Sequence, residues 1–350
     1  MSPDLHPAAA AGRHTVSIHH VEHLLLGACA RGLDGDVLLR RAGIAPLLRA
    51  SPLSRVTQEQ LARLVRLLQQ RLRDELWGLC GTPVRIGTFA QVARLCIGCS
   101  TLGEALAVGL RQFRLSQPVL VPRLQLRSGT AVVSVGLAPL DHSPSAGGAY
   151  AQRVVAFFAY RMACWLVARP LPLLAVDYPR QAARIVEGEL LFGAPVRNDR
   201  SRAAWHLESR WLDLPVVQDR TALDMLLRQA PASIIAKYRA PGSAAEATRR
   251  VLRQHLAAGL ALPELADVAR QLALDPRTLR RHLADEGQPY RRLRDALRRD
   301  LAVELLGREP LTLPQLAQRL GFSEASTFCR AFKQWTGMAP GAYRLARQQV

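Results

Sequence analysis

The strongest constraint on the fold is an apolar two-helix pattern that occurs twice near the C-terminus, at nearly the same spacing. Four inward positions of a first helix recur at i, i+3, i+4 and i+7: Leu265, Val268, Ala269 and Leu272 in one copy, and Leu313, Leu316, Ala317 and Leu320 in the other. Two apolar positions of a second helix also recur: Leu279 and Leu283, then Phe328 and Phe332. Because this spacing gives a helix one buried face, each copy predicts two short helices packed on each other.

The residues between the two helices predict a helix-turn-helix in both copies. Gly321 is available for the positive φ of a tight turn, and Ser323 is the candidate N-cap of the helix that follows. In the upstream copy, Asp275 is the candidate N-cap and Pro276 takes the first helical position, where no amide donor is needed. A unit of this kind places its second helix in the major groove of DNA. We expect the motifs over residues 266–287 and 314–337.

The segment between the motifs predicts a single connecting helix. Apolar residues recur along it at helical spacing: Tyr290, Leu293, Leu297, Leu301 and Leu305. At 1.5 Å per residue the helix spans roughly 25 Å, which with the half-widths of the motifs allows recognition helices about 34 Å apart. One chain is therefore expected to contact two successive major-groove segments on one face of the duplex.

The outer faces of the two second helices carry the candidates for base contacts. They are Arg277, Arg280 and Arg281 in the first motif, and Ala325, Ser326, Cys329 and Arg330 in the second. Arginine specifies guanine through paired hydrogen bonds in the major groove. The candidates for phosphate contacts are Arg291, Arg298 and Lys333. The run from 291 to 299 also alternates with acidic residues, which is equally consistent with a solvated helix face.

The formal net charge of the 350 residues is +19, which supports a polyanionic partner such as nucleic acid. Nearly all of the basic residues are arginines, a bias that a GC-rich genome would also produce. The net charge is therefore supporting evidence for DNA binding and does not establish it alone.

The string from Gly321 to Arg344, G-F-S-x-x-S-x-F-x-R-x-F-K-x-W-x-G-x-x-P-x-x-Y-R, resembles the AraC/XylS family of bacterial transcription regulators. The paired motifs agree with this family over about the last hundred residues; Ala273 departs from it, since the family often has glycine there. The resemblance implies a regulator that binds double-stranded promoter DNA and acts with RNA polymerase. It also implies an N-terminal domain that senses a ligand or forms a homodimer.

The length of the chain and a Pro-Gly-Ser break predict two domains. The helix and strand patterns predict that the first is of α+β class, and the second is the all-α DNA-binding domain with its two helix-turn-helix motifs and connecting helix. Pro241, Gly242 and Ser243 mark the boundary. We expect an effector-binding or dimerisation domain over residues 1–240, a linker over 241–248, and the AraC-type DNA-binding domain over 249–347.

Within the first 240 residues, capping-box patterns at 57–60 and 101–104 predict helix starts, and an apolar helix is expected over 150–167. Strands are expected over 118–126, 130–137, 173–176 and 204–207, the first two joined by Ser128 and Gly129. Tracts at 87–89, 101–106, 191–196 and 211–215 resemble the sensor domain of the family subgroup typified by the ornithine-utilisation regulator, which carries an arabinose-binding label. That label does not identify the effector, which we expect to be a small organic molecule.

Other constellations favour structural roles. Cys96 and Cys99 have the spacing of a redox or metal pair, but no second pair accompanies them and core packing is favoured. His19 and His23 lie one helical turn apart without a third ligand, so a solvated helix face is favoured over a metal site. No nucleophile elbow and no phosphate loop occurs, so neither an enzyme nor a cofactor is expected. No targeting signal or membrane span is recognised, which predicts a cytoplasmic protein without a membrane partner.

Two classes of function remain. The first is a sequence-specific, effector-responsive transcription regulator, with activation as the expected sign. The alternative is an architectural DNA-binding protein without a defined operator. Architectural proteins commonly use minor-groove wedges and a dispersed basic surface, whereas this chain has two groove-entering helices and a large separate domain. The sequence favours the regulator.

Overall fold

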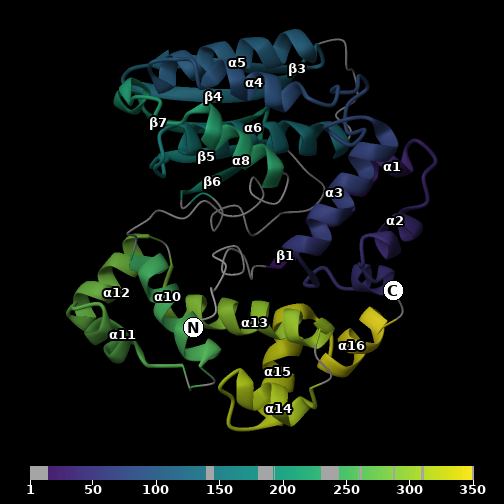
Figure 1. Cartoon of the computed structure of the whole chain (residues 1–350), viewed down its shortest axis with the longest axis vertical. Coiled ribbons are helices and arrows are strands. Elements are labelled where there is room, and N and C mark those ends of the chain that lie inside the picture. The colour runs from purple at the N-terminus through teal and green to yellow at the C-terminus, as the bar shows by residue number, and fades with distance from the viewer. Residues whose placement is uncertain are drawn as a thin grey trace, which may run out of the picture. The chain divides into compact units, whose positions relative to one another are not determined.

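The computed structural model describes residues 15–138, 146–179, 192, 194–229, 244–258, 260, 262–286, 288–308 and 311–348. These residues form two compact units (Figure 1). The first unit contains residues 15–21 and 36–64 together with the described residues from 244 onward, and the second contains 22–35 and the described residues from 65 to 229. The N-terminal segments of the first unit thus lie with the C-terminal helices.

The chain passes from the second unit to the first between the described residues 229 and 244. The Pro241-Gly242-Ser243 break itself lies outside the described residues. The first helix after it begins at Ala244, inside the predicted linker. The functional division of the chain into sensor and DNA-binding domains stays a prediction.

The C-terminal part of the first unit is helical, with two helix-turn-helix motifs joined by one helix. Its elements are α10 (Ala244–Ala257), α11 (Leu265–Gln271), α12 (Pro276–Asp285), α13 (Tyr290–Arg308), α14 (Leu313–Arg319), α15 (Ala325–Thr336) and α16 (Pro340–Gln348). The repeated apolar positions on α12 and α15, which are Leu279, Leu283, Phe328 and Phe332, are fully buried. Figure 1 shows α13 running from the first motif to the second, which confirms the predicted connecting helix.

One predicted helix cap is confirmed and one is wrong. The carboxylate of Asp275 accepts the backbone N–H of Arg277 at 2.8 Å and caps α12, with Pro276 at the first helical position. Ser323 does not cap α15, because that helix begins at Ala325 and its N-cap is Glu324. The reason is the packing of Phe322, whose ring lies 5.7 Å from Phe328 and therefore keeps residues 322 and 323 in the turn.

The two turns share one backbone conformation but not one residue type. Gly321 has φ 73°, as the sequence predicts, and Ala273 takes φ 54° at the matching position of the first motif. An L-residue with a Cβ pays a steric cost in this left-handed region, whereas glycine does not. The first turn is therefore the strained one.

The N-terminal segments of the first unit pack against its C-terminal helices. Strands β1 (Thr15–Ser17) and β2 (Arg55–Thr57) pair antiparallel, β2 contacts α13, and the short helix η2 (Pro46–Ala50) contacts α16. The hydroxyl of the fully buried Tyr343 donates to the backbone carbonyl of Arg55, and the Ser51 hydroxyl donates to the carbonyl of Thr336 at 3.0 Å.

A buried polar network also joins β1 and β2 to α13. The hydroxyl of Thr15 donates to the carboxylate of Asp300 and accepts from Nε of Arg55 at 2.6 Å. Arg299 donates to the same Asp300 oxygen at 3.2 Å. A carboxylate this deeply buried is stable only with such donors, so the network specifies how β1 and β2 lie on α13.

The second unit is an α+β domain built on a five-stranded sheet of order β3-β4-β7-β5-β6. Its strands are β3 (Leu120–Arg127), β4 (Thr130–Leu137), β5 (Ala175–Pro179), β6 (Val196–Arg200) and β7 (Ala203–Glu208). Only the β5–β6 pair is parallel among them. Ser128 and Gly129 both have positive φ, so the predicted hairpin between β3 and β4 is confirmed.

The helices of the second unit include α4 (Thr88–Cys96), α5 (Leu102–Ser116), α6 (Ala146–Leu166), α8 (Arg220–Gln229) and the short η3 (Ser209–Asp213). α5 contacts β3, and α6 contacts β4, β5 and β7. The Thr101 hydroxyl accepts the backbone N–H of Glu104 and starts α5 as predicted. Of the predicted tract at 191–196, residues 191 and 193 lie outside the described part of the chain.

Three of the described helices have residues in both units. α1 (Ile18–Cys29) and α3 (Gln58–Leu72) each begin in the first unit and end in the second, and α2 (Gly35–Arg41) begins at the last residue of a second-unit segment and continues in the first unit. The predicted capping box at the start of α3 is confirmed: Thr57 N–H donates to the Gln60 side chain at 2.9 Å, and Gln60 N–H donates to the Thr57 hydroxyl at 3.2 Å. None of the helices among the described residues has the combined length and hydropathy of a membrane span.

The Ala273–Gly321 pair allows a reciprocal test of turn strain. Ala273→Gly is expected to stabilise the first unit by about 0.5 to 1 kcal/mol, because relief of the left-handed strain exceeds the added entropy of the unfolded chain. Gly321→Ala is expected to destabilise it by about the same amount, since a Cβ there meets no atom closer than 3.4 Å and only the backbone is strained. Urea unfolding monitored by circular dichroism measures both; equal effects of one sign would contradict the assignment.

Tyr343→Phe tests the attachment of the N-terminal segment. The phenyl ring keeps its packing, but the buried Arg55 carbonyl loses its donor, so the opening free energy of α16 should fall by about 1 kcal/mol. Hydrogen exchange of the α16 amides and of the β2 amides measures this change, because the lost hydrogen bond joins the two elements. Leu345→Ala, on an exposed position of the same helix, serves as the control and should leave the exchange of β2 unchanged.

Candidate DNA-binding surface and effector cavity

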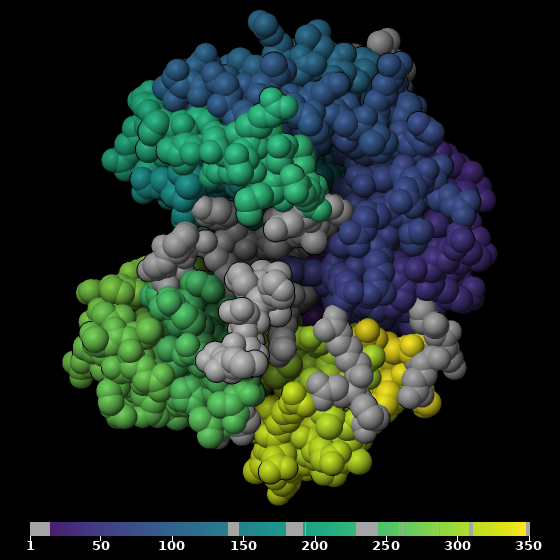
Figure 2. Space-filling view, viewed as in Figure 1, coloured from purple at the N-terminus to yellow at the C-terminus, as the bar shows by residue number. Residues whose placement is uncertain are grey.

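The predicted base-contacting arginines lie at the surface of both motifs. Arg277, Arg280 and Arg281 on α12 are exposed, as are Ser326 and Arg330 on α15; Ala325 and Cys329 are half-buried beside them. Figure 2 shows the two motifs as separate lobes of the first unit, coloured green and yellow-green. The apolar positions that alternate with these side chains are buried, so each second helix presents one polar face outward.

The free face of each second helix suits an anionic duplex. The carboxylate of Asp275 accepts backbone N–H groups at the start of α12. The outer face of that helix carries its three arginines. On α15, Ser326 donates to the Glu324 carboxylate at 3.0 Å, and Arg330 approaches the Thr327 hydroxyl only at 3.5 Å. Lys333 is exposed one turn further along α15.

Two arginines of the connecting helix, both predicted to contact phosphates, have different surroundings. Arg291 is exposed, with only a marginal 4.0 Å ion pair to Asp295. The half-buried Arg298 donates from Nε to the Leu320 carbonyl at 3.0 Å and from Nη2 to the Gly321 carbonyl at 2.9 Å. Its guanidinium also lies 4.7 Å from the centre of the Phe322 ring, and burial lowers its pKa. The geometry gives Arg298 a positioning role at the second turn.

A second attachment on α13 holds the first motif. Arg294 pairs with Glu264, the residue that precedes α11, at 3.2 Å, and the Tyr290 hydroxyl donates to the Pro263 carbonyl. Tyr290, Arg294 and Arg298 follow one another at intervals of four residues along one helix face. Sequence reasoning missed this role; the signal available to it was the tyrosine that continues the face of the two arginines.

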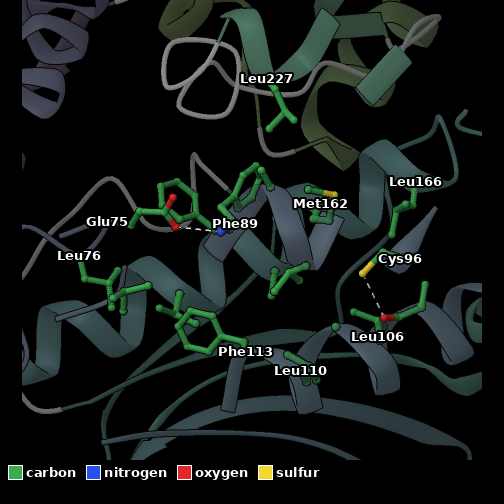
Figure 3. A pocket seen from close by; sticks show the side chains of 18 of the residues that line it. Glu75, Leu76, Phe89, Cys96, Leu106, Leu110, Phe113, Met162, Leu166 and Leu227 are labelled. Carbon is green, nitrogen blue, oxygen red and sulfur yellow. Dashed lines mark hydrogen bonds between the residues drawn. The ribbon is translucent and has the colours of Figure 1, made fainter. Parts of the chain in front are cut away.

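A cavity of about 280 Å³ lies among the helices of the second unit (Figure 3). Its walls come from α4, α5, α6 and α8, from the C-terminal half of α3, and from the segment before α4. Figure 3 shows Phe89, Leu106, Phe113 and Met162 among the apolar side chains around this space. Gly109 lets α5 approach α4 closely, because a Cβ there would meet the Cys96 sulfur at 2.7 Å. An apolar pocket of this kind is typical of a small-molecule site.

Few polar groups line the cavity, and two of them have partners in the protein. The carboxylate of Glu75 accepts the backbone N–H groups of Gly87 at 2.7 Å and Phe89 at 2.8 Å, at the start of α4. Burial raises its pKa despite these two bonds. The Cys96 thiol donates to the Ala105 carbonyl. The other polar groups of the wall are Arg66 and Gln69, both on α3, and the indole N–H of Trp77, which is buried without a hydrogen-bond partner among the described residues.

One member of the cysteine pair and one member of the histidine pair pack against other residues. Cys96 is buried, and burial raises its pKa to about 12, which keeps the thiol neutral and unreactive. Burial also raises the pKa of Cys99. The ring of His23 stacks on Tyr150 at 4.7 Å. Within the described part of the chain, no group of three or more His, Cys, Asp or Glu side chains is arranged to hold a metal ion.

The fold and the two motifs define a DNA-binding protein of the helix-turn-helix class with an attached α+β domain. A family model for the arabinose-binding N-terminal domain of AraC transcription regulators matches residues 32–216, and a helix-turn-helix domain model matches residues 268–346. The first match covers more than half of the chain. The protein belongs to the AraC family of transcription regulators.

Individual relatives agree with this assignment. The ornithine utilization regulator of Pseudomonas aeruginosa is 27% identical over 340 residues, covering 95% of this chain and 96% of that protein. An HTH-type transcriptional regulator of Mycobacterium tuberculosis is 31% identical over 298 residues, covering 80% of this chain and 81% of the relative. The urease operon transcriptional activator of Escherichia coli is 38% identical over 85 residues, covering 24% and 29%.

Substitution of one arginine in each motif tests the outward faces. Arg281→Ala and Arg330→Ala are each expected to weaken operator binding by about 1 to 3 kcal/mol, since each removes a groove contact without touching the buried core. Fluorescence anisotropy at fixed salt measures the change. Arg111→Ala, which removes the same charge from an exposed position on α5 in the second unit, is the matched control; equal affinities in all three variants would contradict the assignment of these faces.

Proposed function

We propose that this AraC-family protein is a sequence-specific, effector-responsive activator of transcription. The observation that carries the proposal is the pair of exposed arginine-bearing faces on α12 and α15, both held by α13. Two groove-entering helices fixed to one rigid element favour a defined operator over dispersed DNA coating. The likeness to the urease operon activator supports activation as the sign of regulation.

In the proposed complex, α12 and α15 enter successive major-groove segments of double-stranded promoter DNA. The base contacts come from Arg277, Arg280 and Arg281 in one motif and from Ala325, Ser326, Cys329 and Arg330 in the other. Arg291 and Lys333 contact phosphates, which position the protein without specifying sequence. Arg298 acts through the turn of the second motif and is a positioning residue.

The regulatory part of the proposal rests on the second unit. Its cavity provides a place for a small effector, and α3, which lines that cavity with Arg66 and Gln69, begins in the first unit. An effector changes DNA affinity only if it binds two states of the protein with different affinities. As a promoter-bound activator, the protein acts in the cytoplasm on RNA polymerase, and a homodimer is the proposed assembly.

Selection of bound sequences from a random DNA pool tests the proposed function. We expect one enriched site with two specified segments about one helical turn apart, and a footprint on one face of the duplex. Excess mixed competitor DNA should leave this complex largely intact. Binding without an enriched sequence, lost to the competitor in proportion to its mass, would support the architectural alternative instead.

A further inference from the structure

We propose that the cavity of the second unit binds a monocarboxylic acid with an apolar body of about ten carbon atoms, its carboxylate facing Arg66 and Gln69. The inference rests on the proposed function, because it names the chemical class of the effector. It adds the site and the residues that select this class.

The size and lining of the cavity determine the body of the ligand. A dry apolar cavity of about 150 Å³ holds benzene, so the 280 Å³ space takes a molecule about twice that size. Three phenylalanines, Phe89, Phe113 and Phe158, line it and are only half-buried. Their rings keep apolar area that a ligand can cover, and burial of that area supplies the main driving force for binding.

The polar groups of the wall determine the ligand's polar end. Glu75 already accepts two backbone N–H groups, and Cys96 is a neutral thiol that donates within the protein. Arg66 makes no ion pair or hydrogen bond with any residue that the structure describes, and it is exposed at the cavity wall. A guanidinium pairs best with a carboxylate, through two parallel hydrogen bonds. Gln69, one turn further along α3, offers an amide donor. The indole N–H of Trp77, which lines the same cavity and is buried without a hydrogen-bond partner among the described residues, is a further donor.

The placement of these groups on α3 links binding to regulation. Arg66 and Gln69 lie in the half of α3 that belongs to the second unit, while the capped start of the same helix lies in the first unit. A ligand that orders the two side chains therefore acts on a helix that both units share. Occupancy of the cavity is expected to change the operator affinity of the full-length protein.

Decanoate is the probe for this site, and decan-1-ol and decylamine are its neutral and cationic counterparts. Isothermal titration of the full-length protein should show one decanoate per chain. Affinity for decanol should be lower by about tenfold or more, the usual effect of losing a charge-assisted hydrogen bond, and decylamine should bind more weakly still. Equal binding of all three would overturn the carboxylate assignment.

Matched variants place the ligand in the cavity. Arg66→Gln should weaken decanoate binding by about tenfold and leave decanol binding unchanged, whereas Arg71→Gln, an exposed arginine of α3 outside the cavity, should change neither. Ala159→Phe fills the cavity and should abolish binding, while Ala107→Phe on the exposed side of α5 should not. If Ala159→Phe does not fold by circular dichroism, Ala90→Leu, a smaller change in the same wall, replaces it.

Operator binding by the ligand-free protein separates this inference from the proposed function. Decanoate binding that survives in the filled-cavity variant, or no decanoate binding by the wild type, overturns the inference. If the ligand-free protein still binds its selected operator in those cases, the proposed DNA-binding function stands. If no operator is found while decanoate binds the cavity, the proposed function fails and the ligand site remains.

Discussion

The attachment of both helix-turn-helix motifs to one helix is the constraint on which the rest of the DNA-binding surface depends. Arg294 ties α13 to the start of the first motif, and Arg298 ties it to the turn of the second. The two contacts lie about one helical turn apart, and the hydroxyl of Tyr290 adds a hydrogen bond from α13 to the Pro263 carbonyl before the first motif. The spacing of the outward arginines is therefore a property of the helix and not of a flexible linker, which is what recognition of two fixed groove segments requires.

Local patterns in the sequence predicted the helical half of the structure well. The repeated apolar spacing located both motifs, and the Asp275 cap and the Thr57–Gln60 capping box formed as expected, because such signals act within one helical turn. The Ser323 cap failed for a non-local reason, since the packing of Phe322 on Phe328 decides where α15 begins. The exposed arginine faces followed from the same apolar pattern, but their DNA contacts stay a prediction.

What the sequence did not predict depends on contacts between residues far apart in the chain. The Thr15–Asp300 and Arg55–Tyr343 hydrogen bonds join the two ends of the chain, and no periodic pattern marks either partner. The cavity has the same origin, because its walls come from segments whose apolar residues look like ordinary core positions. The hydrogen bonds of Arg298 to the second turn were not predicted for a related reason: charge alone does not distinguish an arginine that faces a phosphate from one that bonds to a turn.

Residues 15–21 and 36–64 belong to the same unit as the C-terminal helices, which has a practical consequence for the design of chimeric regulators. The chain passes between the two units after residues 21, 35 and 64 and again between the described residues 229 and 244, and the first three passages fall inside α1, α2 and α3. A chimera that joins a foreign N-terminal part to α10 would pair the α13 and α16 surfaces with a foreign β1, β2 and η2, and the buried Asp300 would lose the Thr15 hydroxyl wherever the foreign strand lacks it. Sensor exchange between relatives should therefore carry residues 15–21 and 36–64 with the recipient's DNA-binding helices, so that the grafted part is an insertion and not an N-terminal half.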